Sequence, residues 1–294
     1  MKSLLTILLI VLTLSSCCTT KKAINTQPEP TKEVTVVTEI PDVAETPETP
    51  ETPKLPDVKI PEPPKPPTLE EVEVIDDYKP EAFNHYRWNQ LLDKNVSISG
   101  NVDYNAFKSD RTELQVYIDN LTENLPTEDW SKQDKLAYWI NAYNALTIDL
   151  ILRNYPLKSI KAIKDPWDQR LWKFGNKWQN LNDIEHKILR KMDEPRIHFA
   201  IVCASISCPK LQNKAFTAVD LEVQLTNATK EFLSDTSKNE LSKDRIKLSK
   251  IFKWFKKDFE QNGTLIDFLN QYSDIIISES AKKSFKDYNW NLND

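Results

Sequence analysis

The sequence has little glycine: three glycines occur in 294 residues, far apart at Gly100, Gly175 and Gly263. Phosphate-binding loops of the Walker and dinucleotide-binding types need closely spaced glycines, so the sequence excludes both. Histidine and cysteine are also scarce, at three and four residues. One histidine and two cysteines nevertheless fall within RIHFAIVCASISCP, residues 196–209, which makes this stretch the first candidate for chemistry.

The N-terminus has the features of a secretory signal peptide, residues 1–16. Lys2 precedes an apolar run from Leu4 to Leu14, which is too short to span a membrane as a helix. The Leu-Ser-Ser-Cys that follows resembles the bacterial lipobox and predicts that Cys17 is lipidated and begins the mature chain. No acidic residue follows Cys17 directly. By resemblance to bacterial sorting signals, this favours the outer membrane, with the protein facing the periplasm.

Residues 17–77 lack aromatic side chains altogether, and 12 of the 18 prolines lie between Thr19 and Asp77. A segment of this composition cannot bury a core and favours extended polyproline conformations. We therefore expect a disordered Pro/Glu/Thr-rich tether between the lipid anchor and a folded domain.

Negative charge is concentrated in that tether. Its charged side chains sum to about −8, whereas residues 78–294 carry about +2 of the formal net charge of −5. A nearly neutral domain lacks the positive face that nucleic-acid binding requires, so no nucleic-acid partner is expected. The 217 residues from Tyr78 onward fit a single globular domain.

Hydrophobic periodicity in residues 78–294 predicts more helices than strands. Ser131 and Asp134 form a capping-box pattern before a long apolar stretch, which predicts a central, buried helix. Helices are predicted at 82–96, 111–121, 131–156, 181–192, 218–234, 250–261 and from Thr264; strands are predicted at 171–179 as a hairpin, 196–205, 245–249, 274–278 and 285–290. This order indicates an α+β fold, with one helix-rich domain around a small, mainly antiparallel sheet.

Five separated blocks follow one another in the domain: KLAYWINAYNALTIDLIL, LNDIEHKILR, RIHFAIVCASISCPKL, LSKIFKWFKKDF and YNWNLN. They resemble the domain-of-unknown-function family 547, whose bacterial members share these blocks in the same order. The resemblance covers the chain from about Tyr78 to the C-terminus. It implies no known reaction, but it directs attention to the Trp-Ile-Asn-Ala-Tyr-Asn helix, the Ile-Glu-His helix and the His-to-Cys strand.

The predicted strand at 196–205 would place His198 and Cys203 on opposite faces, because side chains alternate along a strand. Thiol and imidazole can meet only if the strand ends near Val202 and the chain then turns. The small residues of Ala-Ser-Ile-Ser are suited to such a turn.

One hypothesis is cysteine nucleophilic catalysis. Cys203 would attack a carbonyl as a thiolate, and His198 or His186 would accept the proton. The candidates for a third group that orients the histidine are Glu185, Asn141 and Asn144. The two asparagines share one face of the predicted buried helix, where their amides must be hydrogen-bonded.

Three other interpretations stay open. A Cys203–Cys208 disulfide suits the oxidising periplasm, but it too needs a turn, because bridged Cα atoms lie within about 7 Å. His186, His198 and the two cysteines are zinc-ligand types, yet their spacing is irregular, and no metal is expected. Lastly, the cysteines can be small buried hydrophobes and His198 a hydrogen-bonded sheet residue.

Two aromatic segments have alternative interpretations. Trp167, Trp172 and Trp178 could line a ligand groove or pack as core and cross-strand side chains. Residues 250–259 carry aromatic side chains on one side and lysines around the other. This pattern favours packing against the core over binding to a membrane surface or a glycan polymer.

The sequence therefore predicts an outer-membrane lipoprotein that faces the periplasm. Its domain is expected to be a thiol-dependent hydrolase or transferase acting on envelope peptides or amides, without a cofactor. The alternative is a non-catalytic envelope module that binds a protein or a cell-wall polymer and has a structural Cys203–Cys208 disulfide.

Overall fold

The computed structural model describes residues 82–294. The predicted signal peptide at 1–16, Cys17 and the predicted tether at 17–77 lie outside the described residues. Within 82–294 the fold is α+β and helix-rich, as the sequence predicts. No helix in this range combines the length and the apolar character that a membrane span requires.

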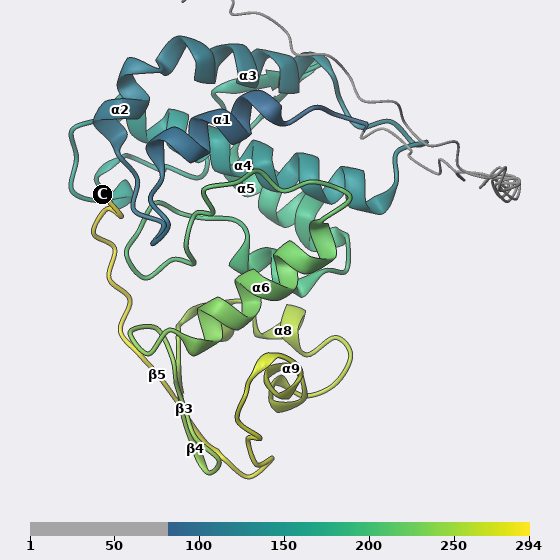
Figure 1. Cartoon of the computed structure of the whole chain (residues 1–294), viewed down its shortest axis with the longest axis vertical. Helices are drawn as coiled ribbons and strands as arrows, with labels where there is room; N and C mark the ends of the chain where they lie inside the picture. Colours follow the sequence, from purple (N-terminus) through teal and green to yellow (C-terminus); the bar gives the residue numbers. More distant parts are fainter. Residues whose placement is uncertain (1–81) are drawn as a thin grey trace, which may run out of the picture. The chain divides into compact units, whose positions relative to one another are not determined.

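Helix α4, Lys132–Asn154, is the centre of the first half of the domain. Its predicted capping box is present, with Ser131 and Asp134 each accepting a hydrogen bond from the other's backbone N–H. Every residue from Leu136 to Leu152 is buried, so α4 is covered on all sides. The helices around it are α1 Tyr86–Asn95, α2 Tyr104–Ser109, α3 Arg111–Glu123 and α5 Leu181–Asp183, with the short 3-10 helix η1 Ile160–Ala162 (Figure 1).

The second half has its own apolar cluster, next to helix α6. Its helices are α6 Leu221–Ser234, α7 Ile251–Trp254, α8 Lys256–Phe259 and α9 Leu265–Tyr272, and its strands are β3 Glu240–Leu241, β4 Arg245–Leu248 and β5 Lys282–Phe285. Figure 1 shows α6, α8, α9 and strands β3 to β5 together in this half. Strand β4 lies in the middle of this sheet, antiparallel to β3 and parallel to β5. The separate predicted hairpin is also present, as β1 Trp172–Phe174 and β2 Lys177–Gln179.

The predicted strand at 196–205 is wrong. Pro195–Phe199 form a 3-10 helix, η4, and the chain then turns. Ile197 packs into the cluster around α4, whereas Phe199 packs into the cluster next to α6. The apolar alternation therefore comes from a short helix that lies between two cores and contributes a side chain to each.

Other boundaries also differ from prediction. The strand predicted at 274–278 is absent, and the one predicted at 285–290 is replaced by β5, which ends at Phe285. The helix predicted at 250–261 is interrupted at Phe255, between α7 and α8. The helix predicted at 181–192 is divided into α5, the π-helix η2 Ile184–Ile188 and the 3-10 helix η3 Leu189–Lys191.

Two buried asparagines of α4 hold the backbone of later segments. Asn141 donates to the carbonyl of Phe216 at 2.7 Å and accepts from its N–H at 3.0 Å. Asn144 donates to the carbonyl of Ala200 at 2.9 Å and accepts from the N–H of Val202 at 3.0 Å. Each amide thus satisfies loop backbone groups that a strand partner would satisfy in a sheet.

Asn144→Ala should lower the free energy of unfolding by about 2–4 kcal/mol, because it leaves the buried Ala200 carbonyl and Val202 N–H without partners. Equilibrium urea denaturation measures this loss. The matched control is Asn154→Ala on the same helix, since Asn154 is exposed and bonds the Leu150 carbonyl within α4. The control should stay within about 0.5 kcal/mol of the unchanged protein; equal losses in both variants would contradict this role of Asn144.

Candidate functional site

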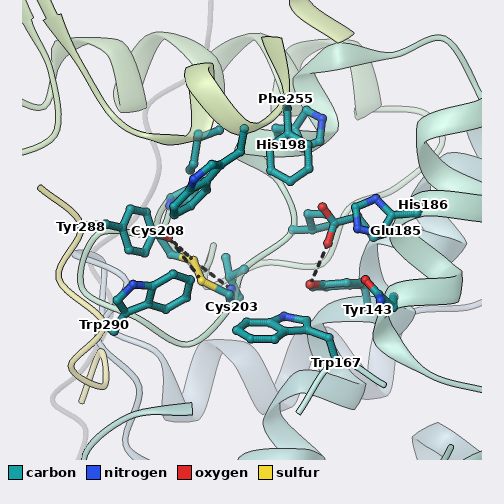
Figure 2. A pocket seen from close by; sticks show the side chains of 16 residues that line it. Tyr143, Trp167, Glu185, His186, His198, Cys203, Cys208, Phe255, Tyr288 and Trp290 are labelled. Atoms are coloured by element: carbon teal, nitrogen blue, oxygen red, sulfur yellow. Dashed lines mark hydrogen bonds between the residues drawn. A yellow bond between two sulfur atoms is a disulfide. The ribbon is translucent and has the colours of Figure 1, made fainter. Parts of the chain in front are cut away.

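A pocket of about 200 Å³ lies where the two apolar clusters meet. Tyr143 and Trp167 line it from the side of α4, and Phe255 and Tyr288 line it from the side of the α6 cluster (Figure 2). The pocket thus depends on the packing of both halves of the domain.

Glu185 provides a carboxyl group inside this pocket. It lies on the π-helix η2 and is buried. The Tyr143 hydroxyl donates a hydrogen bond to its Oε2, with 3.2 Å between the two oxygens (Figure 2). Burial raises the pKa of Glu185 to about 7, although the Tyr143 hydrogen bond and Arg190 act in the opposite direction. Near neutral pH the group therefore exists in both protonation states and can donate or accept a hydrogen bond.

His198 is oriented by Asp258, which lies 60 residues further along the chain. Its Nε2 lies 2.8 Å from Oδ2 of Asp258, and its ring stacks on Phe255 with centroids 3.9 Å apart. Arg190 donates to both oxygens of the same carboxylate, at 2.6 and 2.8 Å. Burial lowers the pKa of His198 against the attraction of Asp258. Burial alone would raise the pKa of Asp258, but the hydrogen bonds from His198 and Arg190 outweigh it and lower that pKa.

His186 has Arg190 as its hydrogen-bond partner. Its Nδ1 lies 2.8 Å from Nη1 of Arg190. Because a guanidinium only donates, Nδ1 accepts, and the neutral ring carries its proton on Nε2. Burial and the Arg190 charge lower the pKa of His186. Both histidines that line the pocket therefore favour the neutral form.

Cys203 and Cys208 are joined in a disulfide whose Cα atoms are 6.2 Å apart. The turn that allows this passes through Ala204, which has the left-handed φ of 56°. Around the sulfur atoms, Sγ of Cys203 lies 3.2 Å from Oγ of Ser205. It also lies 3.4 Å from the hydroxyl of Tyr288 (Figure 2). In this state Cys203 has no free thiol, although it lines the same pocket as His198.

The structure separates the predicted site residues into two groups. Those that line the pocket are Glu185, His186, His198, Cys203 and Cys208. Asn141 and Asn144 do not orient a histidine, because the polar atoms of their amides are bound to loop backbone. Buried amides on one helix face were correctly expected to be hydrogen-bonded, but sequence spacing alone did not identify their partners.

The aromatic side chains that line the pocket, its aromatic wall, are only partly those predicted from the sequence. Of the three tryptophans considered as groove residues, Trp167 lines the pocket, Trp172 is buried and donates to Asp149, and Trp178 is exposed. Trp254 and the C-terminal Trp290 complete the wall. Both lie in sequence blocks that carry the resemblance to family 547, and this resemblance is the sequence signal that points to them. No sequence signal linked Asp258 to His198.

Within the part of the chain that the structure describes, no group of three or more His, Cys, Asp or Glu side chains is arranged to hold a metal ion. The zinc-type residues His186 and His198 instead bond Arg190 and Asp258, and the two cysteines bond each other.

A family model described as "Protein of unknown function, DUF547" matches residues 127–233. This segment contains α4, Glu185, His186, His198 and both cysteines of the disulfide, but neither Asp258 nor the C-terminal aromatic residues. The match supports the resemblance to family 547 over this part of the chain. No curated protein and no solved structure matches the chain.

Glu185→Gln should gain stability relative to the unchanged protein as pH rises. Burial raises the folded pKa from 4.5 to about 7, so the unfolded chain releases this proton at lower pH than the folded chain does. The stability of the unchanged protein therefore falls as pH rises across this window, by about 3 kcal/mol, and the variant lacks this loss.

Urea denaturation at several pH values between about 4 and 8 tests this expectation. The control is Glu123→Gln at an exposed position of α3, which should change stability by less than about 0.5 kcal/mol throughout. Parallel stability curves for Glu185→Gln and the unchanged protein would show that Glu185 titrates as an ordinary surface carboxyl.

Proposed function

We propose that the domain is a binding module of the cell envelope and that its pocket holds a sugar ring of a cell-wall polymer. The observation that carries this proposal is a continuous aromatic wall beside a buried carboxyl group. Trp290 contacts Trp167, Trp254 and Tyr288, with ring centroids 5.9, 5.8 and 4.5 Å apart. Glu185 and Tyr143 lie in the same pocket.

This combination suits a sugar better than a purely apolar ligand. A sugar ring has apolar C–H faces, which pack on indole rings, and hydroxyl groups at its edge, which need hydrogen-bond partners. Glu185 supplies such a partner in either protonation state, and the neutral histidines supply others. Cys203 and Cys208 line another part of the same pocket.

The anchor and the location belong to the same proposal. Lipidation of Cys17 would fix the chain to the periplasmic side of the outer membrane, and residues 17–77 would give the domain its reach. The supporting observations are the signal-like N-terminus and the proline-rich, aromatic-free composition of that segment.

Trp254→Ala should weaken the binding of soluble disaccharide fragments of wall glycan about thirtyfold, since a central aromatic contact contributes about 2 kcal/mol. Isothermal titration calorimetry measures the change. Trp178→Ala is the matched control, because Trp178 is 54% exposed and lies outside the pocket, while Trp254 is 46% exposed and lines it. Unchanged affinity in Trp254→Ala, or an equal loss in both variants, would contradict the proposed site.

Cys17→Ala should move the protein from the outer-membrane fraction to the soluble periplasmic fraction, because it removes the proposed lipid attachment. Cys18→Ala, one residue later, should leave the protein in the membrane fraction. Cell fractionation with immunodetection compares the two. Retention of Cys17→Ala in the membrane would reject the anchor.

A second candidate is a thiol-dependent hydrolase or transferase acting on envelope peptides or amides. One observation favours it: Cys203, His186 and His198 line a single pocket. The reaction needs Cys203 as a free thiolate, so Cys203 should be alkylated in the folded protein without reductant, and His198→Ala should slow this labelling. Peptide mapping by mass spectrometry locates the label. Labelling only after reduction would reject this candidate.

A further inference from the structure

The Cys203–Cys208 disulfide belongs to neither of the two apolar clusters. It forms part of the pocket surface, and its two residues differ in burial: Cys203 is partly exposed, while Cys208 is 4% exposed. Both cysteines lie at the pocket, and Cys203 is the more exposed residue of the pair (Figure 2).

The loop that contains the bridge is held on its N-terminal side without it. Asn144 binds the backbone at Ala200 and Val202, immediately before Cys203. Because these hydrogen bonds precede Cys203 in the chain, breaking the disulfide leaves them in place.

The C-terminal tail holds the same loop from the other side. Ser205 and Leu292 form an antiparallel bridge, and the N–H of Ile206 donates to the carbonyl of Asn291 at 2.9 Å. The Cys203–Cys208 disulfide joins residues only five positions apart. It therefore restricts the unfolded chain less than a disulfide that closes a long loop. Its contribution to stability is expected to be smaller for the same reason.

The groups around Cys208 suit a sulfur that leaves as a thiolate. The N–H of Cys203 donates to Sγ of Cys208 at 2.9 Å, and the Tyr288 hydroxyl donates to it at 3.3 Å. Donors of this kind stabilise a thiolate and make it a better leaving group in thiol–disulfide exchange. Ser205 in turn donates to the Tyr288 oxygen at 3.3 Å, which leaves the tyrosine proton available to the disulfide, whose other sulfur, Sγ of Cys203, is 3.4 Å from the same hydroxyl.

We infer that this pair exchanges with the thiols of a dithiol peptide bound in the pocket, an activity separate from the proposed sugar binding. A peptide thiolate attacks Sγ of Cys203, the Cys203–Cys208 bond breaks, and its electron pair remains on Sγ of Cys208. The second peptide thiolate then attacks the peptide sulfur of the mixed disulfide and releases Cys203 as a thiolate. The peptide loses two electrons and becomes a disulfide, and the protein dithiol takes up two protons from water.

The test uses the full chain with Cys17→Ala and Cys18→Ala, so that Cys203 and Cys208 are its only cysteines. The protein is equilibrated with glutathione buffers of increasing reducing strength and with a synthetic dithiol peptide, and free thiols are trapped by alkylation. We expect reversible reduction of the pair with matching oxidation of the peptide. A bridge that stays oxidised in every glutathione buffer would overturn the inference.

The direction of attack is tested with single variants in the same background. Cys208→Ser leaves the accessible Cys203 thiol and should trap the oxidised peptide as a mixed disulfide at least about tenfold faster than Cys203→Ser does, because Cys208 is buried. Equal trapping by both variants would contradict the assignment of Cys203.

Tyr288→Phe should slow reduction of the otherwise unchanged pair by about tenfold, since it removes one donor to the leaving thiolate. An unchanged rate would contradict the role of Tyr288. Circular dichroism of the Cys203→Ser/Cys208→Ser variant should show a folded domain, and unfolding would show that the bridge is structural. Sugar binding is measured separately, so failure of the exchange leaves the binding proposal to be judged by the Trp254 variant.

Discussion

The structure depends on a buried amide that must be hydrogen-bonded. Asn144 lies in the part of α4, from Leu136 to Leu152, in which every residue is buried, so its two polar groups need partners within the protein. The partners are the carbonyl of Ala200 and the N–H of Val202, and this contact fixes the path of the chain just before Cys203. One polar requirement inside an apolar helix thus positions the loop on which the pocket is built.

The charged groups beside the pocket form a second, linked arrangement. Asp258 accepts hydrogen bonds from both His198 and Arg190, and Arg190 also donates to His186. A single carboxylate therefore fixes one imidazole directly and the other through a guanidinium. Because Asp258 belongs to the second half of the domain, this arrangement also ties the two halves together beside the pocket.

Local sequence signals predicted much of the fold. The capping box at Ser131, the Gly175 turn and the amphipathic periodicities reflect interactions within a few residues, and the corresponding elements are present. The segment at 196–205 failed because a 3-10 helix packed between two cores can show the same apolar alternation as a strand. The pairing of His198 with Asp258 spans 60 residues, and nothing in local spacing reveals such a contact.

The C-terminal tail has a consequence for how the protein is made. Tyr288 and Trp290 form part of the pocket wall, and the segment that carries them is pinned by backbone bonds from Leu292 to Lys158 and from Val102 to Asn293. During synthesis, α4 and the loop that contains the two cysteines are made before these residues are added. Until then the apolar residues that line the pocket are exposed to water on this side. A prematurely terminated chain would therefore expose an apolar surface that chaperones or proteases recognise.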